Sequence, residues 1–139
     1  MASFVKYEVF SENLAEKVHN LDTDTLKVML SNSAPNVATH TVRADATEIS
    51  GGNGYTSGGA DSQNATSRSG GATSVTGVDV TFTASGGTIG AFRYAILYND
   101  TSISPADPLI GYWDYGSSIT LADGESFTVD FGSSILTIA

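Results

Sequence analysis

The sequence of 139 residues contains no cysteine, which excludes disulfide bonds, a thiol nucleophile and a zinc–thiolate site. It also lacks any apolar run approaching the roughly 18 residues that a membrane-spanning helix needs, so we expect no membrane partner. The first ten residues show no basic stretch followed by an apolar one. This absence predicts synthesis in the cytoplasm without a signal peptide.

Basic residues are scarce. Six Lys and Arg stand against fifteen Asp and Glu, a formal net charge of −9. After Arg43, only Arg68 and Arg93 oppose ten carboxylates, which leaves a net of −8 in that part of the chain. Such a surface repels phosphate, so we expect no nucleic-acid partner and no binding to anionic membranes. A large partner should be neutral or basic where it makes contact, unless the charge serves only to keep a crowded protein soluble.

Catalytic residue types form no recognisable motif. His19 and His40 are 21 residues apart beside polar turn residues, and each is expected to be solvated or hydrogen-bonded locally. The glycine pairs at 51–52 and 86–87 lack the Lys-Ser/Thr of a phosphate-binding loop, and no serine lies in a G-x-S-x-G motif. We therefore expect no enzymatic activity and no cofactor.

Carboxylates leave one further option, a Ca²⁺ site at one end of a sandwich. The sets that could form it are Asp107 with Asp114, or Asp123 with Glu125 and Asp130. Turn chemistry and an outward strand position explain the second set equally well, and the sequence has no D-x-D-x-D-G loop. We therefore predict no metal site.

Because charged residues are few, we expect Gly, Ser, Thr and Asn to form most of the polar surface. From residue 50 to 76 the only large apolar side chain before Val75 is Tyr55. Glycine and small polar residues disfavour a helix, so turns and polar strands are expected. The Gly-Gly pair at 70–71 predicts a hairpin between residues 60–67 and 72–76.

Alternating apolar residues predict the remaining strands. Leu26, Val28 and Leu30 alternate with Lys27 and Met29, which indicates one buried face. Residues 92–98 are almost continuously apolar, which is typical of a central strand covered on both faces. The strands are expected at 25–31, 78–84, 92–98, 109–115, 126–131 and 134–138.

This spacing predicts a mainly β fold: an antiparallel, jelly-roll-like β-sandwich with less than about 15% helix. Residues 1–21 are expected to form an N-terminal arm or a short amphipathic helix through Leu14, Val18 and Leu21, and residues 22–139 a single sandwich domain. The predicted core consists of Leu26, Val28, Leu30, Val80, Phe82, Ala95, Leu97, Phe127 and Val129.

Several segments, in this order along the chain, resemble small virion structural proteins of tailed bacteriophages. They are KVHNL (17–21), DTLKVML (24–30), GNGYTSGG (52–59), FTASGGTIG (82–90), FRYAILYNDT (92–101) and GESFTV (124–129). Within that group the chain looks like a capsid decoration, or cement, protein with a jelly-roll-like sandwich.

The resemblance implies a non-enzymatic protein that binds the outside of a bacteriophage capsid and bridges subunits of the major capsid protein. It implies synthesis in the bacterial host cytoplasm, a place on the outer surface of the virion, and a homo-oligomer, either a dimer or a trimer. The alternative is a tail or fibre component, or a glycan-binding module displayed on the virion.

Aromatic residues are the best candidates for partner contacts because such side chains dominate protein interfaces. We expect Phe4, Tyr7 and Phe10 in the N-terminal segment, Tyr55 in the glycine-rich stretch, and Trp113 to bind a partner. The alternatives are that Phe4 and Phe10 fold back onto their own sandwich, and that Trp113 is a core residue or a plug between subunits.

Overall fold

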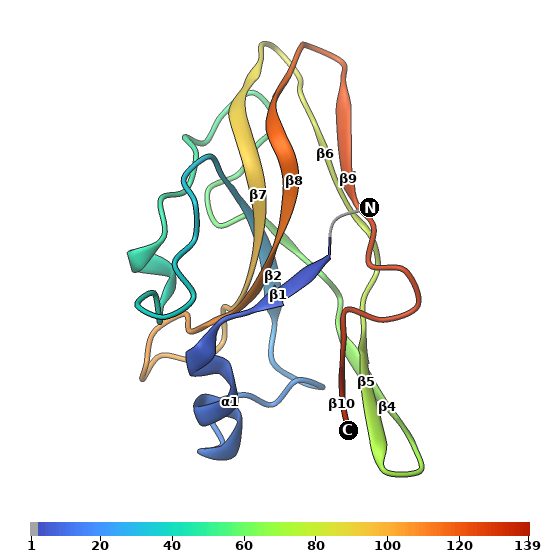
Figure 1. Cartoon of the computed structure of the whole chain (residues 1–139). Coiled ribbons are helices and arrows are strands. Elements are labelled where there is room, and N and C mark those ends of the chain that lie inside the picture. Colours follow the sequence, from blue (N-terminus) through green and yellow to red (C-terminus); the bar gives the residue numbers. More distant parts are fainter. Residues whose placement is uncertain (1–2) are drawn as a thin grey trace.

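The computed structural model describes residues 3–139, and the chain is mainly β, with 46% strand and 8% helix. All strand pairs are antiparallel within the part of the chain that the structure describes. The sheets face one another as the layers of a β-sandwich (Figure 1). The predicted fold class is therefore confirmed at the level of an antiparallel sandwich.

One layer is a sheet of five strands in the order β1-β8-β7-β2-β3. Its strands are β1 (Phe4–Lys6), β2 (Leu26–Ser31), β3 (Ala60–Asp61), β7 (Ile89–Asn99) and β8 (Leu109–Leu121). β7 lies at the centre, between β8 and β2, as its apolar sequence predicted.

The other layer is built from two smaller sheets. One has the order β10-β5-β4, with β4 (Ala65–Ser69), β5 (Ala72–Thr76) and β10 (Leu136–Ile138). The second pairs β6 (Val80–Thr83) with β9 (Ser126–Val129). β4 and β5 form the hairpin that the Gly-Gly pair predicted, with Ser69 opposite Ala72.

The N-terminal segment belongs to the sandwich. β1 pairs with β8, and the Tyr7 N–H donates to the Ile110 carbonyl at 3.1 Å. The helix α1 (Glu8–Ala15) follows at once, earlier than the helix expected through Leu14, Val18 and Leu21. It ends before Lys17, whose φ of 66° is left-handed. A short 3₁₀ turn, η1 (Arg43–Asp45), lies in the long connection between β2 and β3.

The main core lies between the layers and contains every residue of the predicted set. Eight of the nine are buried, and Phe127 is partly buried at the margin. The alternation of apolar residues therefore identified the inward face of β2, β6, β7 and β9.

A second core covers the opposite face of the five-stranded sheet, which corrects the expectation of one buried face for β2. Met29 is completely buried there, beside Tyr7, Ile96 and Tyr98. Partly buried residues of the long β2–β3 connection, Val37 and Ala46, pack against this cluster. Val37 and Ala46 are isolated in the sequence and produce no periodic signal. The sequence therefore did not predict that the β2–β3 connection covers this face of the sheet.

Candidate functional site

The aromatic residues expected to bind a partner lie in the protein's own cores. Tyr7 is 0%, Phe10 4%, Tyr55 2% and Trp113 9% exposed. Phe4 is half-buried and packs edge-on against Trp113, with ring centroids 5.2 Å apart. In this fold these side chains pack internally, as the alternatives for Phe4, Phe10 and Trp113 proposed. That they also bind a partner stays a prediction.

Tyr55 joins the glycine-rich segment to β2. Its hydroxyl donates to Glu48 Oε2 at 2.6 Å and accepts from the Leu30 N–H at 2.9 Å. Glu48 also accepts from the Gly58 N–H and the Arg43 guanidinium, both at 2.6 Å. Burial raises the pKa of the Glu48 carboxyl, but these hydrogen bonds outweigh burial and hold that pKa below its usual value. Burial and the bond to Glu48 raise the pKa of Tyr55, so it remains a hydrogen-bond donor.

His19 is buried and its side-chain partner is 80 residues away, which corrects the expectation of a solvated or locally hydrogen-bonded turn histidine. Its Nδ1 lies 3.0 Å from Asn99 Nδ2, and the same amide group donates to Asp24 Oδ2 at 2.7 Å. Burial lowers the pKa of His19 to about 4, although Asp24 opposes the shift. His40, in contrast, makes the local contact that was predicted, since its Nδ1 accepts from the Asn36 N–H at 3.3 Å.

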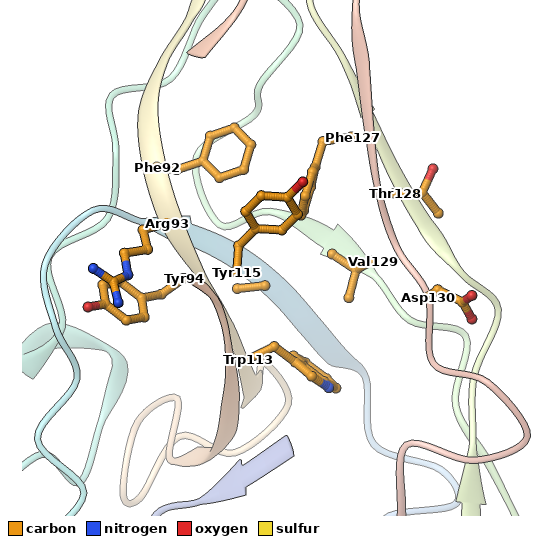
Figure 2. A pocket seen from close by; sticks show the side chains of 10 residues that line it. Phe92, Arg93, Tyr94, Trp113, Tyr115, Phe127, Thr128, Val129 and Asp130 are labelled. Atoms are coloured by element: carbon orange, nitrogen blue, oxygen red, sulfur yellow. The ribbon is translucent and has the colours of Figure 1, made fainter. Parts of the chain in front are cut away.

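The best candidate for a binding site is a cleft between β8 and β9, where the two layers of the sandwich separate (Figure 2). We call it the aromatic cleft. Its volume is about 210 Å³. Ten residues of β7, β8, β9 and the position after β9 line it: Phe92, Arg93, Tyr94, Ala95, Trp113, Tyr115, Phe127, Thr128, Val129 and Asp130.

Tyr115 is the exposed aromatic residue of this lining. It is 57% exposed, and its ring meets Phe127 edge-on, with centroids 5.6 Å apart. Phe127 in turn contacts Phe92 at a centroid distance of 5.0 Å. Trp113 lies deeper, so the cleft leads from an exposed tyrosine into the main core. Its surface suits an apolar group better than a charged one.

A β-bulge in β8 presents Tyr115 to the cleft. Asp114 lies opposite Tyr94, whereas Ile119 lies opposite Phe92. Five steps along β8 therefore match two along β7, and residues 115–118 leave the regular pairing. Gly116 has a φ of 101°, which a residue with a side chain rarely adopts. Bulges of this kind redirect a side chain.

The polar groups around the aromatic cleft are engaged with one another. Arg93 forms a bidentate pair with Asp114, at 2.8 and 3.1 Å. The hydroxyls of Thr128 and Thr81 share a hydrogen bond at 2.9 Å, and Asp130 accepts one from the Gly132 N–H. In Figure 2 the charged ends of Arg93 and Asp130 point away from the ring of Tyr115. No set of polar groups converges on the cleft within residues 3–139.

The carboxylates considered for Ca²⁺ have other partners. Asp114 pairs with Arg93, and Asp107 lies 4.0 Å from Arg43. Asp123 accepts a hydrogen bond from the Gly86 N–H, and Glu125 accepts one from the Ala122 N–H. Throughout residues 3–139, no three His, Asp or Glu side chains gather closely enough to hold a metal ion.

No helix in the described part of the chain is both long enough and apolar enough to cross a membrane. Comparison with protein-family models, with curated proteins and with solved structures returned no match to this chain. The site must therefore be interpreted from its own geometry.

The sequence prediction missed the contributions of Tyr115 and Phe127 to this site. One signal could have identified the first of them: a tyrosine followed by glycine inside an apolar strand indicates a bulge. Nothing in the sequence indicated that β8 and β9 would be separated, because that gap depends on how the two layers meet.

Proposed function

We propose that this protein is a non-enzymatic virion protein that decorates the outside of a tailed-bacteriophage capsid and cements it by bridging subunits of the major capsid protein. The aromatic cleft carries the proposal. It is an apolar opening with an exposed tyrosine, on a molecule with a net charge of −9. Apolar surface of this kind supports contact with another protein.

Two further features support the choice of a capsid as the partner. Six segments in order between residues 17 and 129 resemble phage virion proteins. The net charge of −9 suits an exterior position, because a protein facing packaged DNA would gain from basic residues. A dimer or trimer is part of the same proposal, and sedimentation of the purified protein tests it.

The mechanism needs binding alone. Each copy holds neighbouring shell subunits together, and a few kcal/mol per bridge is multiplied over the many copies on the shell. A subunit that begins to leave the shell must first release the protein attached to it. The capsid therefore withstands a higher temperature or internal pressure before it ruptures.

Purified protein added to heads that lack it tests this function. We expect the protein to co-sediment with the heads and to raise the temperature at which they release DNA, and to delay rupture at low salt. Heads that already carry their full complement are the control and should bind no more. Failure to bind, or binding that leaves the rupture temperature unchanged, would contradict the cement function.

A second candidate follows from the exposed ring of Tyr115, which could stack on a sugar. In that case the protein is a tail or fibre component, or a glycan-binding module of the virion. Electron microscopy of virions labelled with an antibody to this chain separates the two. Many copies over the head support decoration, and a few copies at the tail support an adhesin.

A further inference from the structure

We propose that the aromatic cleft binds an extended, basic segment of the partner protein, which inserts one large apolar side chain beside Tyr115 and pairs its backbone with the free edge of β9. This inference rests on the proposed function for the identity of the partner, a capsid subunit. The chemistry of the segment follows from the geometry of the cleft itself.

The size of the cleft favours a single side chain. Its volume of about 210 Å³ lies below the roughly 300–1,000 Å³ of typical small-molecule sites. Phe127 and Trp113 offer apolar surface on two sides, and Tyr115 closes the mouth with a ring that is already partly exposed. An aromatic or large aliphatic side chain would fill such a pocket and serve as the anchor of the interface.

The backbone of β9 supplies the second part of the site. β9 pairs with β6 on one side only, and in residues 3–139 no strand pairs with its other edge. Three consecutive residues of β9, Phe127 to Val129, line the cleft and no residue of β6 does, so the edge of β9 away from β6 borders it. The bulge at residues 115–118 makes the neighbouring part of β8 irregular. An unpaired strand edge accepts an added strand through main-chain hydrogen bonds, while a neighbouring pocket selects its side chain.

Charge determines what should flank the anchor. From residue 114 to the end of the chain there are four carboxylates and no Lys or Arg. Three of them, Asp123, Glu125 and Asp130, are exposed in the turn before β9 and directly after it. They favour a segment with lysine or arginine beside the apolar residue.

Two other occupants fit less well. A sugar needs polar groups that converge on its hydroxyls, whereas Arg93 and Asp114 bind each other and Asp130 points outward. A second copy could offer Ile103, which is 87% exposed on the β7–β8 loop, but Asp100 and Asp107 flank that isoleucine. A segment around Ile103 has no Lys or Arg of its own to place beside the carboxylates near the cleft, because the chain has no basic residue after Arg93.

Trp113, the only tryptophan of the chain, lines the cleft and reports its occupancy by fluorescence. The probe is a short capped peptide in which lysine and threonine alternate around one central phenylalanine. We expect a saturable change of Trp113 emission with this peptide, and an affinity at least about tenfold lower when alanine replaces phenylalanine or glutamate replaces lysine. Equal or absent responses to all three peptides overturn the proposal, as does a saturable response to a panel of oligosaccharides alone.

Two variants assign any binding to the cleft. Tyr115→Ser should abolish the response to the basic peptide, and Ile103→Ser, which removes an exposed apolar side chain elsewhere, should leave it unchanged. Both should melt like the parent protein, because both side chains are largely exposed. Equal peptide affinity for the two variants would show that the cleft is not the site.

The same variants separate this inference from the proposed function. If the parent protein binds undecorated heads and Tyr115→Ser binds them equally well, the inference fails and the decoration function stands. If the parent protein does not bind heads but takes the basic peptide through Tyr115, the capsid function fails and the binding mode stands.

Discussion

The imidazole of His19 lies in the core, 5.4 Å from the ring of Phe10, with Asn99 and Asp24 as its polar neighbours. The Asn99 amide donates toward Nδ1, so protonation would place two donors face to face. The folded pKa is about 4, below the ordinary value of 6.5. The unfolded chain therefore binds a proton first as the pH falls, and the contribution of His19 to stability is present above pH 6.5 and lost toward pH 4.

We expect the free energy of unfolding to fall by about 2 kcal/mol between pH 7 and pH 5 on account of His19 alone. Urea denaturation at the two pH values measures it. His19→Gln removes the titration, so the variant should lose about 2 kcal/mol less than the parent over this interval. The same loss in both proteins would show that His19 is not the titrating group.

The ring of Tyr55 packs in the main core, and its hydroxyl makes two hydrogen bonds. Tyr55→Phe keeps the ring but leaves Glu48 without one donor and the Leu30 N–H without its acceptor. We expect a loss of roughly 1.5–3 kcal/mol of stability, because one of these bonds involves a charged group. Chemical denaturation measures this loss of stability. The control is Tyr115→Phe: the hydroxyl of Tyr115 has no hydrogen-bond partner within residues 3–139, so its removal should cost nothing measurable.

Among the elements, β3 depends on a close approach to β2 at Gly59. A Cβ placed there would lie 1.8 Å from the Val28 carbonyl oxygen, and the φ of 80° disfavours any side chain. Gly59→Ala should therefore cost more than about 3 kcal/mol and detach β3 from the sheet. Gly71→Ala, at the open tip of the β4–β5 hairpin, should change stability by less than about 0.5 kcal/mol. Thermal melting of the two variants is the measurement, and similar melting temperatures would contradict the close packing of β3.

The same elements show what a sequence can reveal. The alternation in 25–31, 78–84 and 126–131 predicted three strands and the residues that they turn toward the main core, because alternating apolar residues are visible in the local sequence. In β2 the other face is buried as well, which that alternation did not predict. β1 has only three residues, too few for a period, and its place on β8 depends on contacts more than a hundred residues away. The aromatic cleft arises from the gap between two layers, and that long-range geometry has no local sequence signal.

At the scale of the whole molecule, the N-terminal segment connects the two cores. Phe4 and Phe10 pack with the main core between the layers, and Tyr7 between them belongs to the cluster on the opposite face of the sheet. Alternate anchors of one short segment thus reach both sides of the five-stranded sheet. Because helix α1 and β1 follow each other directly, the segment is a structural part of the sandwich and not a free arm.

Deletion of residues 1–10, of which residues 1 and 2 lie outside the described structure, should therefore destabilise the fold itself. It removes β1 and two buried aromatic side chains, each worth about 3–5 kcal/mol on truncation, a loss comparable to the whole stability of a domain of this size. We expect the truncated chain to lose its cooperative thermal transition. Val5→Ser, within the same strand but on a partly exposed side chain, should melt close to the parent.

A truncated chain that melts cooperatively near the parent temperature would show instead that the segment is dispensable for folding and free to make contacts elsewhere. If the truncated chain is unfolded, weaker binding to the capsid reflects the loss of the fold and not the loss of a contact. Tyr115→Ser, and not the truncation, is therefore the informative variant for binding.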